Sequence, residues 1–294
     1  MTRRRLTLFA FVGVLAIAAT VSFGQRFGGR SRTPPGVIPD DRAGVPNWHV
    51  DEQFKKDVFT FVRIEYDSFG RGGFGGGGRR RGGFGGYGGW ATDYPDSDLN
   101  FSFRLQQLTS LKVNPVPITM RVTDERLCDY PFIYIIEPGN LSFSEEECVA
   151  LRRYLLNGGF LMVDDFWGEY ARQNFLQQMK RVFPEPQYEP EELPFDHEIF
   201  RCVYRLKEKP QVPSIHTWQW NQGVTWEDHG PGSETVHYMG INDDKGRLMA
   251  IICHNTDLGD GWEREGENEE YFHEFSEKKS YPMGINIVTY AMTH

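Results

Sequence analysis

Two neighbouring carboxylates at the end of an apolar run are the first candidates for chemistry. Asp164 and Asp165 lie in GGFLMVDDFWGEY, residues 158–170, where FLMV has the apolar character of a strand covered on both faces. Adjacent carboxylates raise each other's pKa or bind a cation, so the pair could form a reaction centre or a ligand site. The alternative is local: Asp165 caps the following helix, and Asp164 accepts backbone N–H groups in a turn.

A second group of candidates follows another apolar run. CHNTDLGDGWE, residues 253–263, contains His254, Asp257, Asp260 and Trp262. A histidine beside carboxylates supplies a metal ligand or a proton shuttle, and the two glycines let the backbone approach a ligand. The aspartate spacing matches a calcium-binding loop only loosely, and simple turn formation is the alternative.

Two further stretches could contact a ligand. PFDHEIF places His197 between Asp196 and Glu198, where a helix N-terminus is the alternative. Three tryptophans, Trp218, Trp220 and Trp226, could stack on sugar rings, although alternating tryptophans in a strand more often pack half-buried. The candidate ligand-binding residues are therefore Asp164, Asp165, His197, His254, Asp257, Asp260 and Trp262, and the candidate metal ligands are Asp164, Asp257 and His254.

Alternating helices and strands are expected to position these residues. Within residues 141–159, Ser144 and Glu147 form a capping box and Gly158 ends the helix. An earlier helix is capped by Ser97 or Asp98, and two more cover residues 169–182 and 282–294. Strands are predicted at residues 58–66, 117–122, 132–136, 160–163, 200–206, 235–241 and 247–255.

This alternation predicts a three-layer α/β fold with a mostly parallel sheet flanked by helices. NDDKG, residues 242–246, is a turn that makes the last two strands an antiparallel hairpin in the C-terminal half. In an open parallel sheet, ligands bind beyond the carboxyl ends of the strands. Both groups of candidate aspartates follow such ends, so we expect them to converge.

The N-terminal part is typical of an exported protein. Residues 1–24 have three arginines, an apolar run and small residues before Gln25, which is the layout of a cleaved signal peptide. The alternative is a membrane anchor over residues 6–23, although the apolar run is short for a span. Residues 25–48 are predicted to be a flexible linker and residues 49–294 a single domain, with a disordered Gly/Arg-rich insert at residues 70–89. The expected location is the periplasm or cell envelope.

The excess of acidic residues limits the classes of partner that we expect. Residues 90–294 carry 18 Lys and Arg against 34 Asp and Glu, and so acidic a body would repel a phosphate backbone. We therefore expect no nucleic acid, and a membrane contact only through the N-terminal segment if it is uncleaved. The expected partner is an envelope protein or polysaccharide.

Four cysteines, Cys128, Cys148, Cys202 and Cys253, allow up to two disulfides. They form no C-x-x-C motif, and buried free thiols are favoured.

Several motifs together resemble a bacterial family, domain-of-unknown-function family 4159, over roughly residues 54–294. They are GGWATDYPDSDLNF, YPFIYIIEPGNLSFSEEECVALRRYLLNGGFLMVDDFWG, RVFPE, LPFDHEIF, DLGDGWE and GINIVTYAM. The resemblance implies a flavodoxin-like fold similar to class I glutamine amidotransferases, with FLMVDD as the strand before the βα elbow. Those enzymes carry a nucleophilic cysteine at the elbow, where this chain has Asp164 and Asp165. Glutaminase activity is therefore not expected.

Two functions remain open from the sequence. The favoured one is an exported, non-catalytic domain that binds a ligand or partner at the strand ends through Asp164, Asp165, His254 and Asp257. The other is a metal-assisted hydrolase, in which the same carboxylates with His197 or His254 hold a divalent ion. A divalent metal is the one cofactor considered.

Overall fold

Seven strands form one sheet in the order β3-β1-β4-β6-β9-β8-β7. The computed structural model describes residues 36–54, 57–68, 89–221 and 223–294. The strands are β1 (Val62–Ile64), β3 (Ile118–Met120), β4 (Phe132–Ile136), β6 (Phe160–Asp164), β7 (Glu191–Glu192), β8 (His237–Asn242) and β9 (Leu248–His254). β3, β1, β4, β6 and β9 run parallel, while β8 and β7 pair antiparallel at one end. The predicted α/β class and the C-terminal hairpin are confirmed.

The five parallel strands, counted in chain order, are arranged 2-1-3-4-5. This is the order of flavodoxin-like doubly wound sheets, which bind ligands outside the carboxyl ends of their strands. A separate antiparallel pair, β2 (Asp67–Ser68) and β5 (Leu141–Ser142), lies outside the main sheet.

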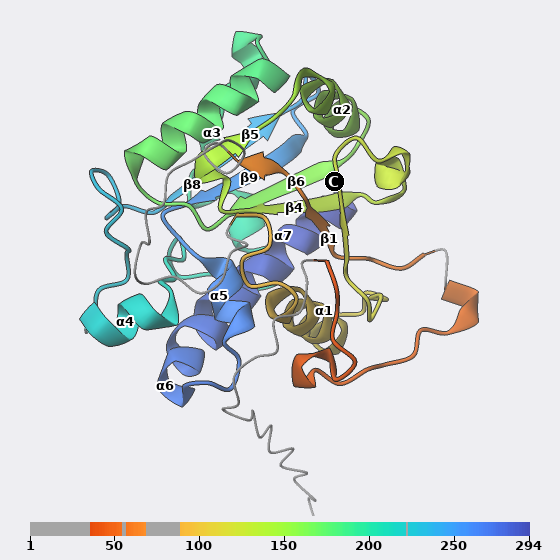
Figure 1. Ribbon diagram of the computed structural model, residues 1–294, viewed down its shortest axis with the longest axis vertical. Coiled ribbons are helices and arrows are strands. Elements are labelled where there is room, and N and C mark those ends of the chain that lie inside the picture. Colours follow the sequence, from red (N-terminus) through yellow and green to blue (C-terminus); the bar gives the residue numbers. More distant parts are fainter. Residues whose placement is uncertain (1–35, 55–56, 69–88, 222) are drawn as a thin grey trace, which may run out of the picture.

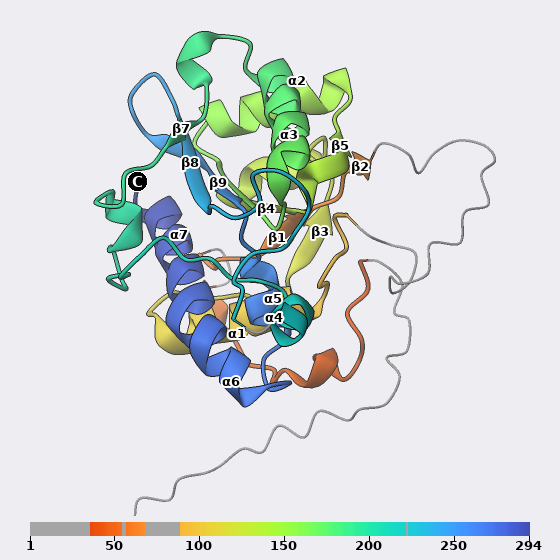
Figure 2. The same ribbon diagram turned by 90° about the vertical axis from the view of Figure 1, so that its left-hand side faces the viewer.

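Helices cover both faces of the sheet. Figures 1 and 2 show α2 (Glu145–Leu156) and α3 (Gly168–Val182) on one side, and α1 (Asp96–Leu108), α5 (Leu258–Glu263) and α7 (Tyr281–Thr293) on the other. Two short helices, α4 (Ile215–Asn221) and α6 (Glu269–Tyr271), lie at the periphery, and a π-helical segment, Phe272–Ser280, leads into α7. The capping box of Ser144 and Glu147 at the start of α2 is confirmed.

The central strands are apolar throughout because each face meets a different core. In β4, Tyr134 and Ile136 pack into the core on the α1, α5 and α7 side, while Ile133 and Ile135 pack into the core on the α2 and α3 side. Successive side chains of a strand point to opposite faces, so a strand buried on both sides cannot alternate with polar residues. The same reasoning holds for FLMV in β6.

One predicted strand is wrong, and the stretch of alternating tryptophans is not a strand either. Residues 200–206 form the end of a 3-10 helix followed by a turn and bends, where the side chain of Asn286 in α7 accepts from the backbone N–H groups of Val203 and Tyr204 at 3.1 and 2.7 Å. Residues Ile215–Asn221, which carry Trp218 and Trp220, form α4 rather than an alternating strand. In both places a tertiary contact or a local helix overrides the β propensity of the aromatic residues.

The predicted cap of α1 is also wrong. The helix begins at Asp96 without a side-chain cap, because Ser97 and Asp98 turn inward to hydrogen-bond Arg63. The Asp98 side chain, which the local spacing predicts as a helix cap, instead forms an ion pair with Arg63.

The predicted signal peptide, residues 1–24, and all but Gly89 of the predicted insert at residues 70–89 lie outside the described residues. Residues 36–48 lie against the domain: Val45 is buried, Arg42 donates to Pro115 O at 2.7 Å, and Trp48 Nε1 donates to Val113 O at 2.8 Å. Among the described helices, none has the length and apolarity needed to cross a membrane. All four cysteines are free, as expected, but only Cys148 and Cys253 are buried; Cys128 is exposed and Cys202 half-buried, so the expectation of burial is wrong for these two.

Candidate functional site

The candidate site lies where the carboxyl ends of the parallel strands meet. β4 and β6 end side by side, with Ile136 paired to Asp164, and β9 runs parallel on the other side of β6. The loops that follow these strands approach one another: Asp165 N donates to Thr256 O at 3.2 Å, and Asn255 N donates to Phe166 O at 2.9 Å.

Asp164 is completely buried at this edge. Its Oδ2 accepts hydrogen bonds from Tyr134 Oη at 3.1 Å and from Gly259 N at 3.0 Å, whereas its Oδ1 has no hydrogen-bond partner among the described residues. Burial raises the pKa of Asp164 to about 7. A buried carboxylate with one free oxygen is the kind of group that accepts a ligand or a proton.

Asp165 turns away from the strand direction. Its φ of 54° is in the left-handed region, which is uncommon for a residue with a side chain. Asp165 Oδ1 accepts from Trp167 Nε1 at 3.1 Å, and α3 begins after Trp167 without a side-chain cap. The helix-cap alternative is therefore wrong. Burial, followed by repulsion from Glu137 and Asp93, raises the pKa of Asp165 well above its usual range.

Asp257 and Asp260 lie on the loop and helix after β9. Asp257 caps α5 by accepting from Asp260 N at 2.7 Å, and its pKa is raised well above the usual range by burial and by repulsion from Asp165 and Asp260. Asp260 Oδ2 accepts from Ile215 N at 2.8 Å and from Tyr271 Oη at 3.1 Å. Burial, then repulsion from Glu263, raises the pKa of Asp260 to about 7.

Asp93 joins these carboxylates although no predicted strand delivers it. It precedes α1, has a φ of 60°, and its Oδ2 has no hydrogen-bond partner among the described residues. Burial, followed by repulsion from Glu263 and Asp260, raises its pKa well above the usual range. Asp93 Oδ2 and Tyr134 Oη both lie close to Gly259. A Cβ atom at this glycine would lie 3.1 Å from Asp93 Oδ2 and 3.0 Å from Tyr134 Oη, so a larger residue would crowd both groups.

Arg63 of β1 holds the segment that presents Asp93. Its guanidinium is fully buried, forms an ion pair with Asp98, and donates to Trp90 O at 3.0 Å and Thr92 O at 2.7 Å. These bonds fix both the turn before Asp93 and the first turn of α1 after it. Arg63 is therefore the residue that positions Asp93.

Asp93, Asp165 and Asp257, which we call the acidic triad, place one carboxylate oxygen each within 4.8 Å of the others. Oxygen ligands lie about 2.0–2.6 Å from Mg²⁺ or Ca²⁺, so two ligands of one ion are at most about 5 Å apart. The triad thus has the spacing that one divalent cation requires. Asp164, which is fully buried, lies beside it and contributes to the raised pKa values of Asp165 and Asp257.

A second group shares Asp93 and consists of Asp93, Asp260 and Glu263. This group has its own counter-ion, because Arg264 Nε lies 2.6 Å from Glu263 Oε2 and 3.3 Å from Asp260 Oδ1. A guanidinium at this distance already balances the negative charge that a cation would balance. The acidic triad is consequently the better of the two sites for an ion.

Three of the sequence candidates lie apart from the triad. His254 packs its ring against Phe166 and hydrogen-bonds Gly168 O at 3.1 Å, on the α3 side of the sheet; burial lowers its pKa to about 4. Trp262 is fully buried beside Phe101, with ring centroids 4.3 Å apart. His197 caps the 3-10 helix Glu198–Phe200 and packs on Tyr290, which contacts Phe160 at the opposite end of β6.

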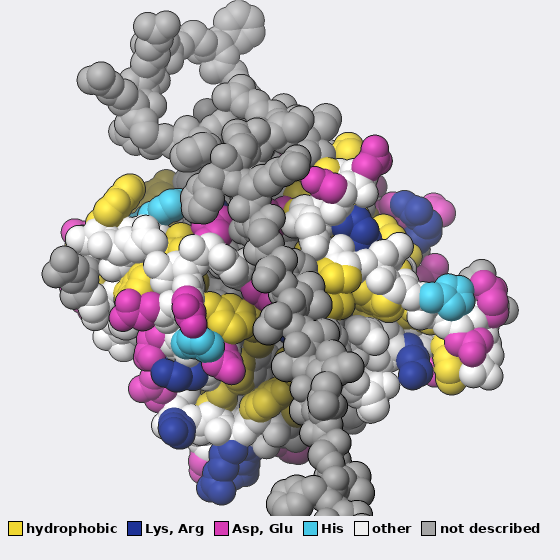
Figure 3. Space-filling view, turned by 90° about the horizontal axis from the view of Figure 1, so that it is seen from below, with side chains coloured by type: hydrophobic (Ala, Val, Ile, Leu, Met, Phe, Trp, Pro, Cys, Tyr) yellow, Lys and Arg dark blue, Asp and Glu magenta, His cyan; other side chains and the backbone are white. Residues whose placement is uncertain are grey.

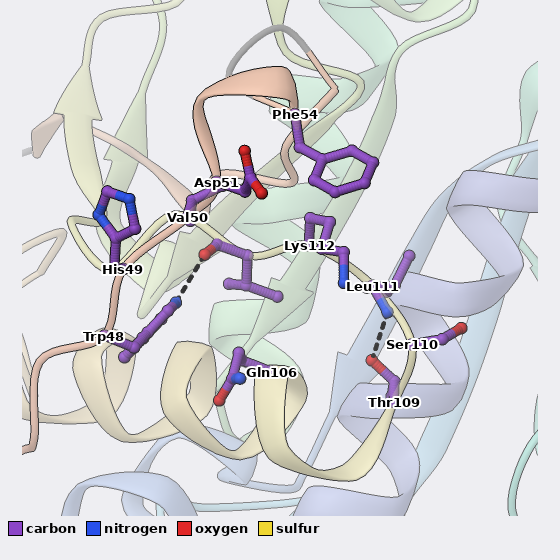
Figure 4. A pocket seen from close by; sticks show the side chains of 11 residues that line it. Trp48, His49, Val50, Asp51, Phe54, Gln106, Thr109, Ser110, Leu111 and Lys112 are labelled. Carbon is purple, nitrogen blue, oxygen red and sulfur yellow. Dashed lines mark hydrogen bonds between the residues drawn. The ribbon is translucent and has the colours of Figure 1, made fainter.

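One hollow of the surface lies away from these carboxylates. It has a volume of about 300 Å³ and lies between residues 48–54 and the end of α1, as Figure 4 shows. None of the carboxylates of the acidic triad lines it. Acidic, basic and hydrophobic side chains are interspersed on the face shown in Figure 3, apart from the grey atoms that cover part of it.

Residues 78–292 match the family described as "Domain of unknown function (DUF4159)". Comparison with curated proteins gives no match. The matched segment covers well over half of the chain and contains every carboxylate of the site, Asp93 included. The chain therefore belongs to the DUF4159 family.

Proposed function

We propose that this domain binds one divalent cation of the oxygen-preferring kind, such as Mg²⁺, Mn²⁺ or Ca²⁺, through the acidic triad. The observation that carries the proposal is the convergence of three carboxylates from three separate segments within 4.8 Å at the carboxyl ends of the strands. Fully buried Asp164, with its unpartnered Oδ1, adds a further acceptor beside them. Without a cation, so many buried carboxylates are held together only by taking up protons.

The proposed biological setting is the cell envelope, with export directed by residues 1–24 and with an envelope protein or polysaccharide as the partner. The strand order supports a flavodoxin-like fold related to class I glutamine amidotransferases. Glutaminase chemistry is not part of the proposal. Cys253, in the strand that pairs with β6, is buried, and burial raises its pKa well above the usual range, so it is not an activated nucleophile.

Isothermal titration calorimetry with Mn²⁺, after treatment with a chelator and its removal, tests the proposal. Wild type should bind one ion per chain, and Asp165→Asn should bind none. Asp196→Asn removes an exposed carboxylate outside the site and should bind like wild type. Absence of binding for Mn²⁺, Mg²⁺ and Ca²⁺, or unchanged binding by Asp165→Asn, would exclude the proposed site.

A further inference from the structure

The hollow between residues 48–54 and the C-terminal end of α1 has the size and lining of a small-ligand site (Figure 4). Its volume of about 300 Å³ is at the lower end of the range of about 300–1,000 Å³ for such sites, which fits a ligand of one ring. Trp48 and Phe54 supply aromatic faces from the first segment, and Leu111 and Val113 supply apolar contacts from the second. The hollow is therefore lined by aromatic and apolar side chains from both segments.

The two segments are fixed to each other. Trp48 Nε1 donates to Val113 O at 2.8 Å, and the Trp48 ring packs against Phe103 of α1 with ring centroids 5.8 Å apart. Phe59 N donates to Lys112 O at 2.8 Å, and Phe59 pairs with Val113 in a parallel bridge. These contacts hold the chain before β1 against the end of α1, so the hollow is a preformed part of the fold.

Lys112 places a positive charge in this hollow. Its Nζ lies over the ring of Phe54, 5.3 Å from the ring centroid. Among the described residues that line the hollow, Asp51 is the one carboxylate, and its oxygens accept from Gln53 N at 3.1 Å and Gln53 Nε2 at 3.3 Å. No described carboxylate forms an ion pair with Lys112. The ammonium group is therefore available to an anionic group of a ligand.

A comparison with Lys279 shows what Lys112 lacks. Lys279 Nζ lies 5.4 Å from the centroid of the Phe275 ring, which is nearly the same geometry, but it also forms an ion pair with Glu208 at 3.1 Å. A carboxylate bound in the hollow would complete at Lys112 the arrangement that the chain itself completes at Lys279.

Gln106 and His49 supply further hydrogen-bond donors at the hollow, and Figure 4 shows both among its lining residues. Neither side chain forms a hydrogen bond or an ion pair with a described residue. An amide and a neutral imidazole can each donate to an anionic oxygen. Lys112 is thus accompanied by donors that remain free for the same ligand.

We propose that this hollow binds a small aromatic carboxylate, with the carboxylate at Lys112 and the ring against Trp48 and Phe54. A carboxylate gains a charge-assisted hydrogen bond from an ammonium group, and an aromatic ring gains offset or edge contacts with other rings. None of the acidic triad lines the hollow, so binding here does not depend on the proposed cation site.

Ligand-observed NMR titration of the full chain with benzoate, in the presence of a chelator, tests this site. Wild type should bind benzoate about 10-fold or more tightly than benzamide, its uncharged analogue, because only benzoate pairs with the Lys112 charge. Lys112→Met should remove this difference, and Lys112→Arg should retain it. Lys279→Met is the matched control, because Lys279 has the same ring geometry but lies outside the hollow; it should bind both compounds like wild type.

The Lys112 side chain is exposed, so its replacement should leave the fold intact, which urea unfolding verifies. Absence of benzoate binding, equal affinity of wild type for benzoate and benzamide, or unchanged benzoate affinity in Lys112→Met would overturn the proposal. Tighter binding of hexanoate than of benzoate would overturn the assignment of an aromatic ligand. Because the chelator removes divalent cations, these outcomes are separate from success or failure of Mn²⁺ binding at the acidic triad.

Discussion

Asp165 and Asp257, which follow two neighbouring parallel strands, bring carboxylate oxygens to within 4.8 Å of each other. Both are buried, and repulsion from Asp165 contributes to the raised pKa of Asp257. Such a pair is stable in a folded protein only when protons or a cation balance the charge.

Replacement of Arg63 should destabilise the fold and weaken cation binding together. Arg63→Met leaves the fully buried Asp98 without its ion pair, and breaking a buried pair on one side costs about 3–5 kcal/mol. Because Arg63 also holds the turn before Asp93, the Mn²⁺ affinity of the folded variant should fall by about 10- to 100-fold. Urea unfolding and calorimetry measure the two effects. Arg126→Met breaks an exposed ion pair with Asp124 and should change neither.

In the presence of a chelator, stability should fall as pH rises from about 4 to about 7. Burial raises the pKa of Asp164 and of Asp260 to about 7, above the value of about 3.9 in an unfolded chain. Between these values the folded state binds more protons than the unfolded state, so raising the pH favours unfolding. His254 acts in the opposite direction, between about 6.5 and 4, since burial lowers its pKa to about 4.

Urea unfolding at several pH values isolates the carboxylate contribution. Asp164→Asn should lose less stability than wild type over the same pH interval, because it no longer has that group to deprotonate. Identical pH dependence in the two proteins would contradict the account of Asp164.

His254→Gln should bind Mn²⁺ as tightly as wild type. The His254 ring packs against Phe166 and hydrogen-bonds Gly168 O on the α3 side of the sheet, whereas Asp93 of the acidic triad lies near Gly259 and Tyr134. This variant distinguishes two proposed sets of metal ligands: the set suggested by the sequence, which includes His254, and the acidic triad, which does not. Calorimetry is the measurement, and loss of binding would restore His254 as a ligand.

Removal of Arg264 should create a second cation site. Arg264 now balances Asp260 and Glu263, which form a second ligand group with Asp93. Arg264→Gln should therefore raise the stoichiometry from one Mn²⁺ per chain to two. Arg104→Gln breaks a different ion pair, with Glu265, and should leave it at one. One ion in both variants would count against the second group as a ligand set.

The sequence could locate much of this site because parallel strands end at one edge of a sheet. Asp164 ends β6, Asp165 follows it, and Asp257 lies three residues after the end of β9, so their convergence is a consequence of the predicted topology. His254 is the last residue of β9, and its ring packs against Phe166 and hydrogen-bonds Gly168 O instead of joining the acidic triad. Spacing alone does not show which face a residue after the strand will take, and Asp165 in particular adopts a positive φ.

Asp93 could not be predicted in this way. No strand directly precedes it, and its position depends on Arg63, which is 30 residues earlier in the chain and fully buried. An arginine inside an otherwise apolar strand, FVRIEY, is the sequence signal that was available, because a buried guanidinium requires a carboxylate and several carbonyl partners.

The melting temperature should depend on Mn²⁺ through the triad alone. A ligand that binds only the folded state at 100 times its Kd stabilises it by about 2.7 kcal/mol. Thermal melts of wild type and Asp196→Asn should therefore shift upward with Mn²⁺, while Asp93→Asn and Asp257→Asn should not. A shift that persists in both triad variants would place the ion elsewhere.

The most direct measurement is a crystal structure of the protein grown with Mn²⁺, with anomalous diffraction data to locate the ion. The account predicts one anomalous peak about 2.0–2.6 Å from carboxylate oxygens of Asp93, Asp165 and Asp257. A peak bound by other residues, or saturating Mn²⁺ with no peak between these three carboxylates, would contradict it.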